Sequence, residues 1–339
     1  MKNPAHPPLT RPVVAALALT SLSAAMPASA ITTLKIGGLI DMSVGTSQAP
    51  GISKGLAGVQ SGSMSTSWLG IEGNEELNMG WSALFQLQQF LRPDTGETGR
   101  FTGDGQFTRA AHVGLKHSRY GTLTGGRNTT PLFISTVVHN AFGDSFGFSP
   151  AVRQYFSSNT VSGDTGWNDS VLYVSPSFDG FNASVMAAPG EGSGSRNWGY
   201  TLGYWKGGMG LSYSQQSVRK DSPTQTVDDT RTSQIGTSYT LGPVKLFAQS
   251  GEVQNMTTAL SSKISGLGAT LSFGKGSSIM LQAGRIVPKF NIQPIRTTVS
   301  LGYDRALTRY TDLYLVGMSE KVDGLSDGSS VALGLRHNF

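Results

Sequence analysis

Hydrophobic and polar residues alternate with a period of two along most of the chain after residue 30. Residues 81 to 88 place Phe85 and Leu87 on one face and Gln86 and Gln88 on the other. This period predicts β-strands with one apolar and one polar face, whereas helical spacing is hard to find. An earlier face holds only apolar residues and glycine: Leu34, Ile36, Gly38, Ile40, Met42 and Val44.

The alternating pattern recurs often enough to define a whole fold. It predicts an all-β protein, a 16-stranded antiparallel transmembrane β-barrel, because a barrel needs lipid-facing and lumen-facing residues in turn. Strands are expected near residues 33–46, 65–77, 79–91, 106–117, 120–129, 168–175, 180–189, 197–206, 208–217, 231–241, 243–254, 262–273, 277–287, 295–306, 310–321 and 329–339.

Short and long connections between the segments also alternate. The short ones, at 206–208, 241–243 and 273–276, contain glycine or proline and suit tight turns. Outer-membrane barrels pair short periplasmic turns with longer external loops. The polar stretches 47–64, 92–105 and 218–230 are therefore predicted to be external loops.

One connection, from Thr130 to Trp167, is far longer than the others. A loop this long without secondary structure of its own is usually functional. It contains Phe142, Phe146 and Phe148, which are costly to expose to water. We therefore expect residues 130–167 to fold inward and pack against the barrel wall; the alternative is a disordered external loop.

The first thirty residues have the features of a secretory signal peptide. Lys2 and Arg11 precede an apolar run, and Ala28-Ser29-Ala30 offers a cleavage site. A transmembrane helix would need about 20 apolar residues, more than this run supplies. The predicted organisation is a signal peptide over 1–30 and a barrel over 31–339, with 130–167 as a constriction loop.

Composition excludes several other classes of protein. The chain has no cysteine, so neither disulfides nor thiolate metal sites can form. With 14% charged residues, 44 glycines and a mean hydropathy of -0.13, it resembles neither a helical membrane bundle nor a typical soluble enzyme. A net charge of +5 without any Lys/Arg run does not indicate nucleic-acid binding. No cofactor is expected.

Enzymatic motifs are weak. The segment Gly324-Leu-Ser-Asp-Gly328 matches the nucleophile-elbow pattern but falls between two predicted strands rather than on a strand-to-helix turn. The five histidines show no metal-ligand spacing. The sequence therefore favours a protein that is not an enzyme.

Several motifs, in order, resemble the trimeric general porins of Gram-negative bacteria, particularly the beta-proteobacterial branch. The resemblance covers almost all of the predicted mature chain. Its motifs are Trp68-Leu-Gly-Ile-Glu-Gly-Asn-Glu-Glu-Leu, Arg109-Ala-Ala-His-Val-Gly-Leu, Tyr120-Gly-Thr-Leu-Thr-Gly-Gly-Arg-Asn-Thr-Thr-Pro131, Ser175-Pro-Ser-Phe-Asp-Gly-Phe181, Leu301-Gly-Tyr-Asp-Arg-Ala-Leu and the closing Gly334-Leu-Arg-His-Asn-Phe339.

The resemblance implies a homotrimer in outer-membrane lipid and lipopolysaccharide, with passive diffusion of ions and small hydrophilic solutes through each barrel. It also implies that Phe339 helps the barrel-assembly machinery to recognise the chain. A channel specific for a sugar or an organic acid is the alternative. An adhesin with a plugged pore is favoured least.

The resemblance further implies a constriction with basic wall residues opposite acidic loop residues. Arg109 and Arg127 match wall positions of the family, and Asp144 is the best candidate for the loop charge. Trp68 and Trp167 are departures, because relatives often carry cations there. Loss of two cations would weaken an anion preference, and these tryptophans are also what favours the substrate-specific alternative.

Two points stay open in the sequence. Asp164 and Asp169 are weaker candidates for the loop charge, since both suit ordinary solvated loops. Arg109 shares its alternation with Ala111 and Val113, so the pattern does not say which face is the lumen. We expect Arg109 to face inward, because an arginine facing lipid at mid-depth costs roughly 2–4 kcal/mol.

Overall fold

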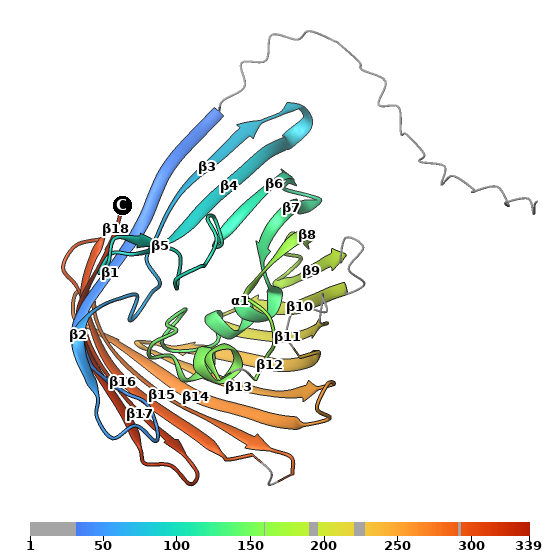
Figure 1. Ribbon diagram of the computed structural model, residues 1–339. Coiled ribbons are helices and arrows are strands. Elements are labelled where there is room, and N and C mark those ends of the chain that lie inside the picture. Colours follow the sequence, from blue (N-terminus) through green and yellow to red (C-terminus); the bar gives the residue numbers. More distant parts are fainter. Residues whose placement is uncertain (1–31, 159, 190–195, 220–227, 291–292) are drawn as a thin grey trace, which may run out of the picture. The chain divides into compact units, whose positions relative to one another are not determined.

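The computed structural model describes residues 32–158, 160–189, 196–219, 228–290 and 293–339. The predicted signal peptide, residues 1–30, lies outside them. The described chain is almost entirely antiparallel sheet, joined in sequence order (Figure 1). Its strands are β1 (Thr32–Gln48), β2 (Leu56–Ser61), β3 (Trp68–Glu76), β4 (Trp81–Arg92), β5 (Glu97–Thr98), β6 (Ala110–His117), β7 (Gly121–Thr129), β8 (Gly166–Val174), β9 (Phe181–Pro189), β10 (Arg196–Lys206), β11 (Met209–Val218), β12 (Thr230–Leu241), β13 (Val244–Asn255), β14 (Ser261–Phe273), β15 (Ser277–Pro288), β16 (Arg296–Ala306), β17 (Thr311–Val322) and β18 (Gly328–Asn338).

The strands close into a barrel of sixteen wall strands. β2 and β3 pair with successive halves of β1 and form one wall strand interrupted at residues 62–67, and β5 pairs only with the end of β4. β18 pairs with β1, so the sheet has no open ends. Phe339 extends this seam: its backbone N–H and C=O both bond Gly38, each at 3.1 Å. The predicted closed barrel is confirmed.

One predicted loop is wrong. Residues 47–64 were expected to be an external connection, but β1 continues to Gln48 and β2 already begins at Leu56. The segment Leu56–Ser61 is rich in small residues and has little alternation, so it carries a weak strand signal. The segment still forms a strand, because it pairs with the long β1 and gains the hydrogen bonds of that ladder. Strand formation depends on such context more than on local propensity.

The two faces of the wall differ as the alternation predicts. On β15, Ile279 and Leu281 are exposed on the outside, whereas Gln282 and Gly284 face the interior and are buried. The closing strand repeats this arrangement, with Val331 and Leu333 outside. A barrel in lipid needs an apolar outer band and tolerates a polar interior.

The long connection between β7 and β8 is not free of secondary structure, which corrects the sequence expectation. It contains α1 (Pro131–Val138), α2 (Pro150–Val152) and the short helical turn η2 (Arg153–Ser157). Thr130 caps α1 by accepting a hydrogen bond from the Phe133 backbone N–H at 3.3 Å, and Pro131 suits the first turn. A further turn, η1 (Asn78–Gly80), joins β3 to β4. No helix in the described residues is long and apolar enough to cross a membrane.

The outward position of Leu301, midway along β16, gives a test of the fold. We expect Leu301→Arg to lower the free energy of unfolding in lipid vesicles by about 2–4 kcal/mol, because the charge would face the bilayer at mid-depth. Urea titration of the refolded protein measures this. Leu307→Arg, in the turn after β16, is the matched control and should cost about 0–1 kcal/mol; equal effects would contradict the assigned wall orientation.

Candidate functional site

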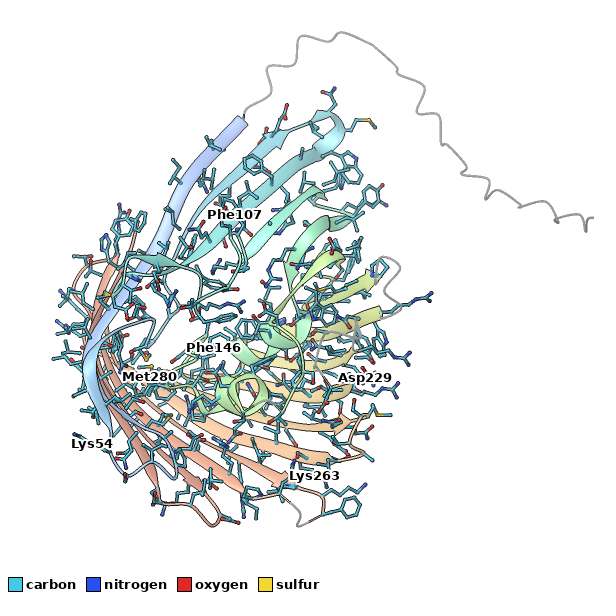
Figure 2. The ribbon with its side chains drawn as sticks, in the orientation of Figure 1. Lys54, Phe107, Phe146, Asp229, Lys263 and Met280 are labelled. Carbon is cyan, nitrogen blue, oxygen red and sulfur yellow. The ribbon has the colours of Figure 1, made fainter. Side chains whose placement is uncertain are left out.

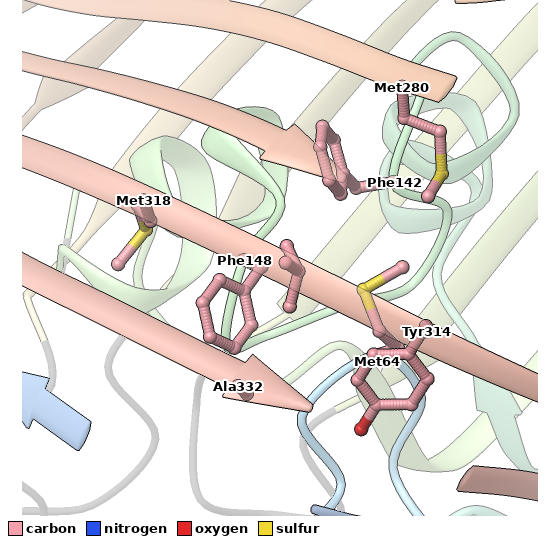
Figure 3. Packing of buried hydrophobic residues seen from close by; sticks show 8 residues of the cluster. Met64, Phe142, Phe148, Met280, Tyr314, Met318 and Ala332 are labelled. Carbon is pink, nitrogen blue, oxygen red and sulfur yellow. The ribbon is translucent and has the colours of Figure 1, made fainter. Parts of the chain in front are cut away.

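The segment 131–157 lies inside the barrel, packed against the inner wall of its later strands (Figure 1). Phe142 and Phe148 enter a buried apolar cluster with side chains of β15, β17 and β18 (Figure 3). Phe146 also lies inside the wall (Figure 2) and stacks on Phe133 of α1, with ring centroids 5.8 Å apart. Burying each large apolar side chain contributes roughly 1.5–3 kcal/mol. The wall partners are Met280, Tyr314, Val316, Met318 and Ala332.

Inward-facing glutamines bind the backbone of the same segment. The Gln249 Nε2 donates to the carbonyls of Thr136 and His139, each at 2.8 Å. The Gln282 Oε1 accepts from the Ala141 N–H at 3.0 Å. These bonds satisfy backbone groups at the end of α1 and fix its height along the wall.

A buried glutamate holds the second half of the segment. Glu320 on β17 has a side chain only 3% exposed and accepts from Arg153 at 3.0 Å and from Arg296 at 2.6 Å. Arg153 also donates to the carbonyls of Phe146 and Gly147. Removing one partner of such a buried pair typically costs about 3–5 kcal/mol.

The break between β2 and β3 clamps the tip of the segment. The fully buried carboxylate of Asp41 accepts from the N–H groups of Met64 and Ser65, at 2.8 and 2.6 Å, and from the Tyr314 hydroxyl at 2.5 Å. Ser65 then donates to Asp144 at 3.0 Å. Ser145 donates to the Ser63 carbonyl at 2.7 Å, so the loop tip and residues 62–67 form one unit.

Space remains on the opposite side of the interior. A cavity of about 670 Å³ is lined by inward residues of β1, β3, β4, β6 and β7, close to the short-turn end of the barrel. Its charged lining includes Lys35, Glu72 and Lys116, and His112 and Gln86 lie beside them. The Lys35 ammonium lies 3.8 Å from the Glu72 carboxylate. The open half of the interior is thus polar and carries both signs of charge.

Arg109 lies at the external end of this open side, just before β6. Its guanidinium stacks over the Trp68 ring at 4.3 Å and donates to Gln88. Both partners share the inward face, so Arg109 turns inward although its alternation matches the outward Ala111. Burial lowers the pKa of Arg109, and the negative charge of Asp144 opposes that shift. The structure therefore brings Arg109, Trp68 and Asp144 into one neighbourhood.

Arg127 belongs to a different cluster, where the external end of β7 meets the loop before β8. It donates to Asp164 at 2.5 Å and to Asn168 at 2.7 Å, and Arg100 pairs with the same Asp164 at 2.6 Å. Burial would raise the pKa of Asp164, but its hydrogen bonds with Arg100 dominate and lower it. Burial would also raise the pKa of Asp104, but the hydrogen bonds and charge of Arg100 outweigh it and lower this pKa to about 2. These charges neutralise one another and join two external loops.

The remaining predicted residues contribute less charge to the open side. Trp167 is 4% exposed and packs on Met186, Ala188 and Val218 of the neighbouring strands. It therefore supports the wall by packing. Asp169, in β8, is exposed.

Sequence reasoning missed the anchors Asp41, Glu320 and Arg153. Asp41 could have been found from the sequence. It alternates with the apolar face Leu34 to Val44 and therefore lies on the inward face of the first predicted strand, where a carboxylate avoids lipid. No such signal exists for Glu320 and Arg153, which are far apart in the sequence.

Comparison with known proteins agrees with this geometry. Residues 14–325 match the family model described as Gram-negative porin. The chain belongs to the Gram-negative porin family. It is 27% identical over 334 residues to an outer membrane porin protein of Bordetella pertussis, covering 84% of each chain. It is 26% identical to outer membrane porin protein 32 of Delftia acidovorans, over 95% of this chain and 99% of the relative.

Solved porin structures share the fold. The anion-selective porin from Comamonas acidovorans superposes with a TM-score of 0.79 at 22% identity, covering 91% of this chain and all of that chain. The trimer form of OmpT from Vibrio cholerae gives a TM-score of 0.69 at 15% identity, over 91% of this chain and 99% of that one. The protein is an outer-membrane porin and a passive channel, in a family of channels rather than enzymes.

Asp41→Asn tests the clamp at residues 62–67. We expect it to lower the free energy of unfolding by about 1–3 kcal/mol, because an amide cannot accept all of the hydrogen bonds that the carboxylate accepts. Urea titration in lipid vesicles is the measurement. Asp327→Asn, which disturbs only an exposed pair with Lys321, should change stability little. Equal free energies of unfolding for Asp41→Asn and Asp327→Asn would show that the clamp does not stabilise the barrel.

Proposed function

We propose that ions and small hydrophilic solutes cross the barrel between the segment 131–157 and the inner wall formed by β3, β4, β6 and β7. The observation that carries this proposal is the one-sided attachment of the segment. Apart from the clamp at residues 62–67, its apolar and polar anchors fall on the later strands, whereas the polar cavity of about 670 Å³ lies on the early ones. Water and charge are therefore best accommodated along the early strands.

Arg109 and Asp144 set the charge preference of this passage. Arg109 is held by Trp68 and Gln88, and Asp144 is held by Ser65, so both charges have fixed positions. A narrow, partly desolvated passage strengthens the field of such charges. Arginine keeps its charge under physiological conditions even when burial lowers its pKa. Arg127 plays a smaller part, since Asp164 neutralises it.

The working unit is a homotrimer in outer-membrane lipid. Trimeric porins occur among the structural neighbours, including the OmpT trimer form. Phe339 serves as the terminal signal for the barrel-assembly machinery. Phe339 is 54% exposed on the closing seam, so a partner can reach it.

Charge reversal at Arg109 tests the passage. Arg109→Glu should shift the reversal potential of purified channels in a salt gradient toward cation preference, because two acidic groups would then face the passage. Arg119→Glu is the control, since Arg119 lies in the short turn after β6, against Tyr120. Planar-bilayer recording measures both variants. An Arg109→Glu channel with the wild-type reversal potential would reject the assignment, and absence of ohmic steps in the wild type would reject the channel itself.

A further inference from the structure

A second cavity, of about 420 Å³, lies between α1 and the inner wall of β8 to β11. It follows the charged cavity around the wall, and β7 contributes lining residues to both. None of its lining residues is charged. Its volume lies within the range of pockets that bind small molecules.

Four apolar side chains face this cavity while still partly exposed. Ile134 and Val138 stand one turn apart on α1, and Val174 and Trp205 face them from the wall. Their exposed fractions lie between 36% and 49%. Contact between water and this apolar surface is unfavourable, so covering the remaining exposed part of each side chain would be stabilising. A solute with an apolar face would supply that burial.

The Trp205 ring is held in place by a stacked histidine. His139, at the end of α1, stacks on it with ring centroids 5.0 Å apart and planes 6° apart. Gly236 on β12 makes room for this stack, because a Cβ there would lie 2.4 Å from the His139 ring. Burial, and then the charge of Lys245, lower the pKa of His139 to about 4, so the ring is neutral at pH 7. The pocket thus has an aromatic wall, the Trp205 ring, which packs on the neutral ring of His139.

Hydroxyl and amide groups surround the apolar patch. Thr201, Ser184 and Asn182 line the cavity from the wall, and Ser212, which bonds Ser135 of α1 at 2.8 Å, lies beside them. Such groups form hydrogen bonds with neutral hydroxyl or carbonyl groups without favouring either sign of charge. A charged ligand would fit this cavity poorly, because none of the lining residues carries a counter-charge to offset the ligand's desolvation.

We infer that this cavity is a binding subsite for small uncharged solutes that combine an aromatic or other apolar face with hydroxyl groups. The inference rests on the proposed function in one respect, since the solute would reach the subsite through the channel lumen. It separates two routes within one barrel: ions follow the charged wall of β3 to β7, and neutral amphipathic solutes are retained beside α1.

Binding of phenyl β-glucoside, an uncharged and water-soluble probe, tests the subsite directly. Saturation-transfer NMR with the detergent-solubilised protein should show stronger transfer to the phenyl protons than to the sugar protons. Trp205→Ala should raise the half-saturating concentration about tenfold, since it removes the aromatic face. Val138→Ser changes the opposite wall of the cavity at an exposed position and should raise it severalfold. Trp198→Ala, on the outer face of the same strand as Trp205, should leave it unchanged.

Methyl β-glucoside, which lacks the aromatic face, should show little transfer. Equal transfer in the wild type, Trp205→Ala and Val138→Ser, or equal binding of the two glucosides, would overturn the subsite. Parallel bilayer recordings distinguish this failure from a failure of the channel proposal. If the channels are ohmic but binding does not depend on Trp205, only the subsite is contradicted. If binding depends on Trp205 but no ohmic channels appear, only the proposed channel route is contradicted.

Discussion

The structure depends on one constraint: every backbone N–H and C=O that faces lipid must find a partner within the sheet. A strand edge left open in the bilayer would cost several kcal/mol for each unpaired group. The pairing of β1 with β18, extended to Phe339, removes that edge. Closure then divides the side chains into two populations, an outer one in contact with lipid and an inner one around the lumen. Everything that concerns transport occurs in the inner population.

The inner population is unevenly used. Along β13 to β18, inward residues hold the segment 131–157 through apolar clusters, glutamines and the ion pairs of Glu320. Along β3 to β7 they line the open cavity and include the charged side chains of Glu72 and Lys116. The interior is asymmetric, because the inward residues of one wall hold the segment 131–157 and those of the other wall do not. That asymmetry places the proposed passage, and it leaves the uncharged cavity at the boundary between the two halves.

The sequence was sufficient for what depends on local alternation. The strand β15 lies within a residue of its prediction because lipid and lumen impose opposite demands on neighbours such as Leu281 and Gln282. β2 was missed because its small residues satisfy neither demand strongly. The anchors could not be predicted, since they pair residues that only the closed barrel brings together, such as Asp41 and Tyr314. The inward turn of Arg109 likewise depends on Trp68 and Gln88, on other strands.

The most direct test of this asymmetric interior is cysteine accessibility, which the natural absence of cysteine makes clean. Gln86→Cys faces the open cavity, Leu87→Cys faces outward beside it, and Gln282→Cys lies beneath the anchored segment. A negatively charged methanethiosulfonate added during bilayer recording should lower the conductance of Gln86→Cys in steps and leave the other two unchanged. Equal reaction at Gln282→Cys, or reaction at Leu87→Cys without any at Gln86→Cys, would contradict the account.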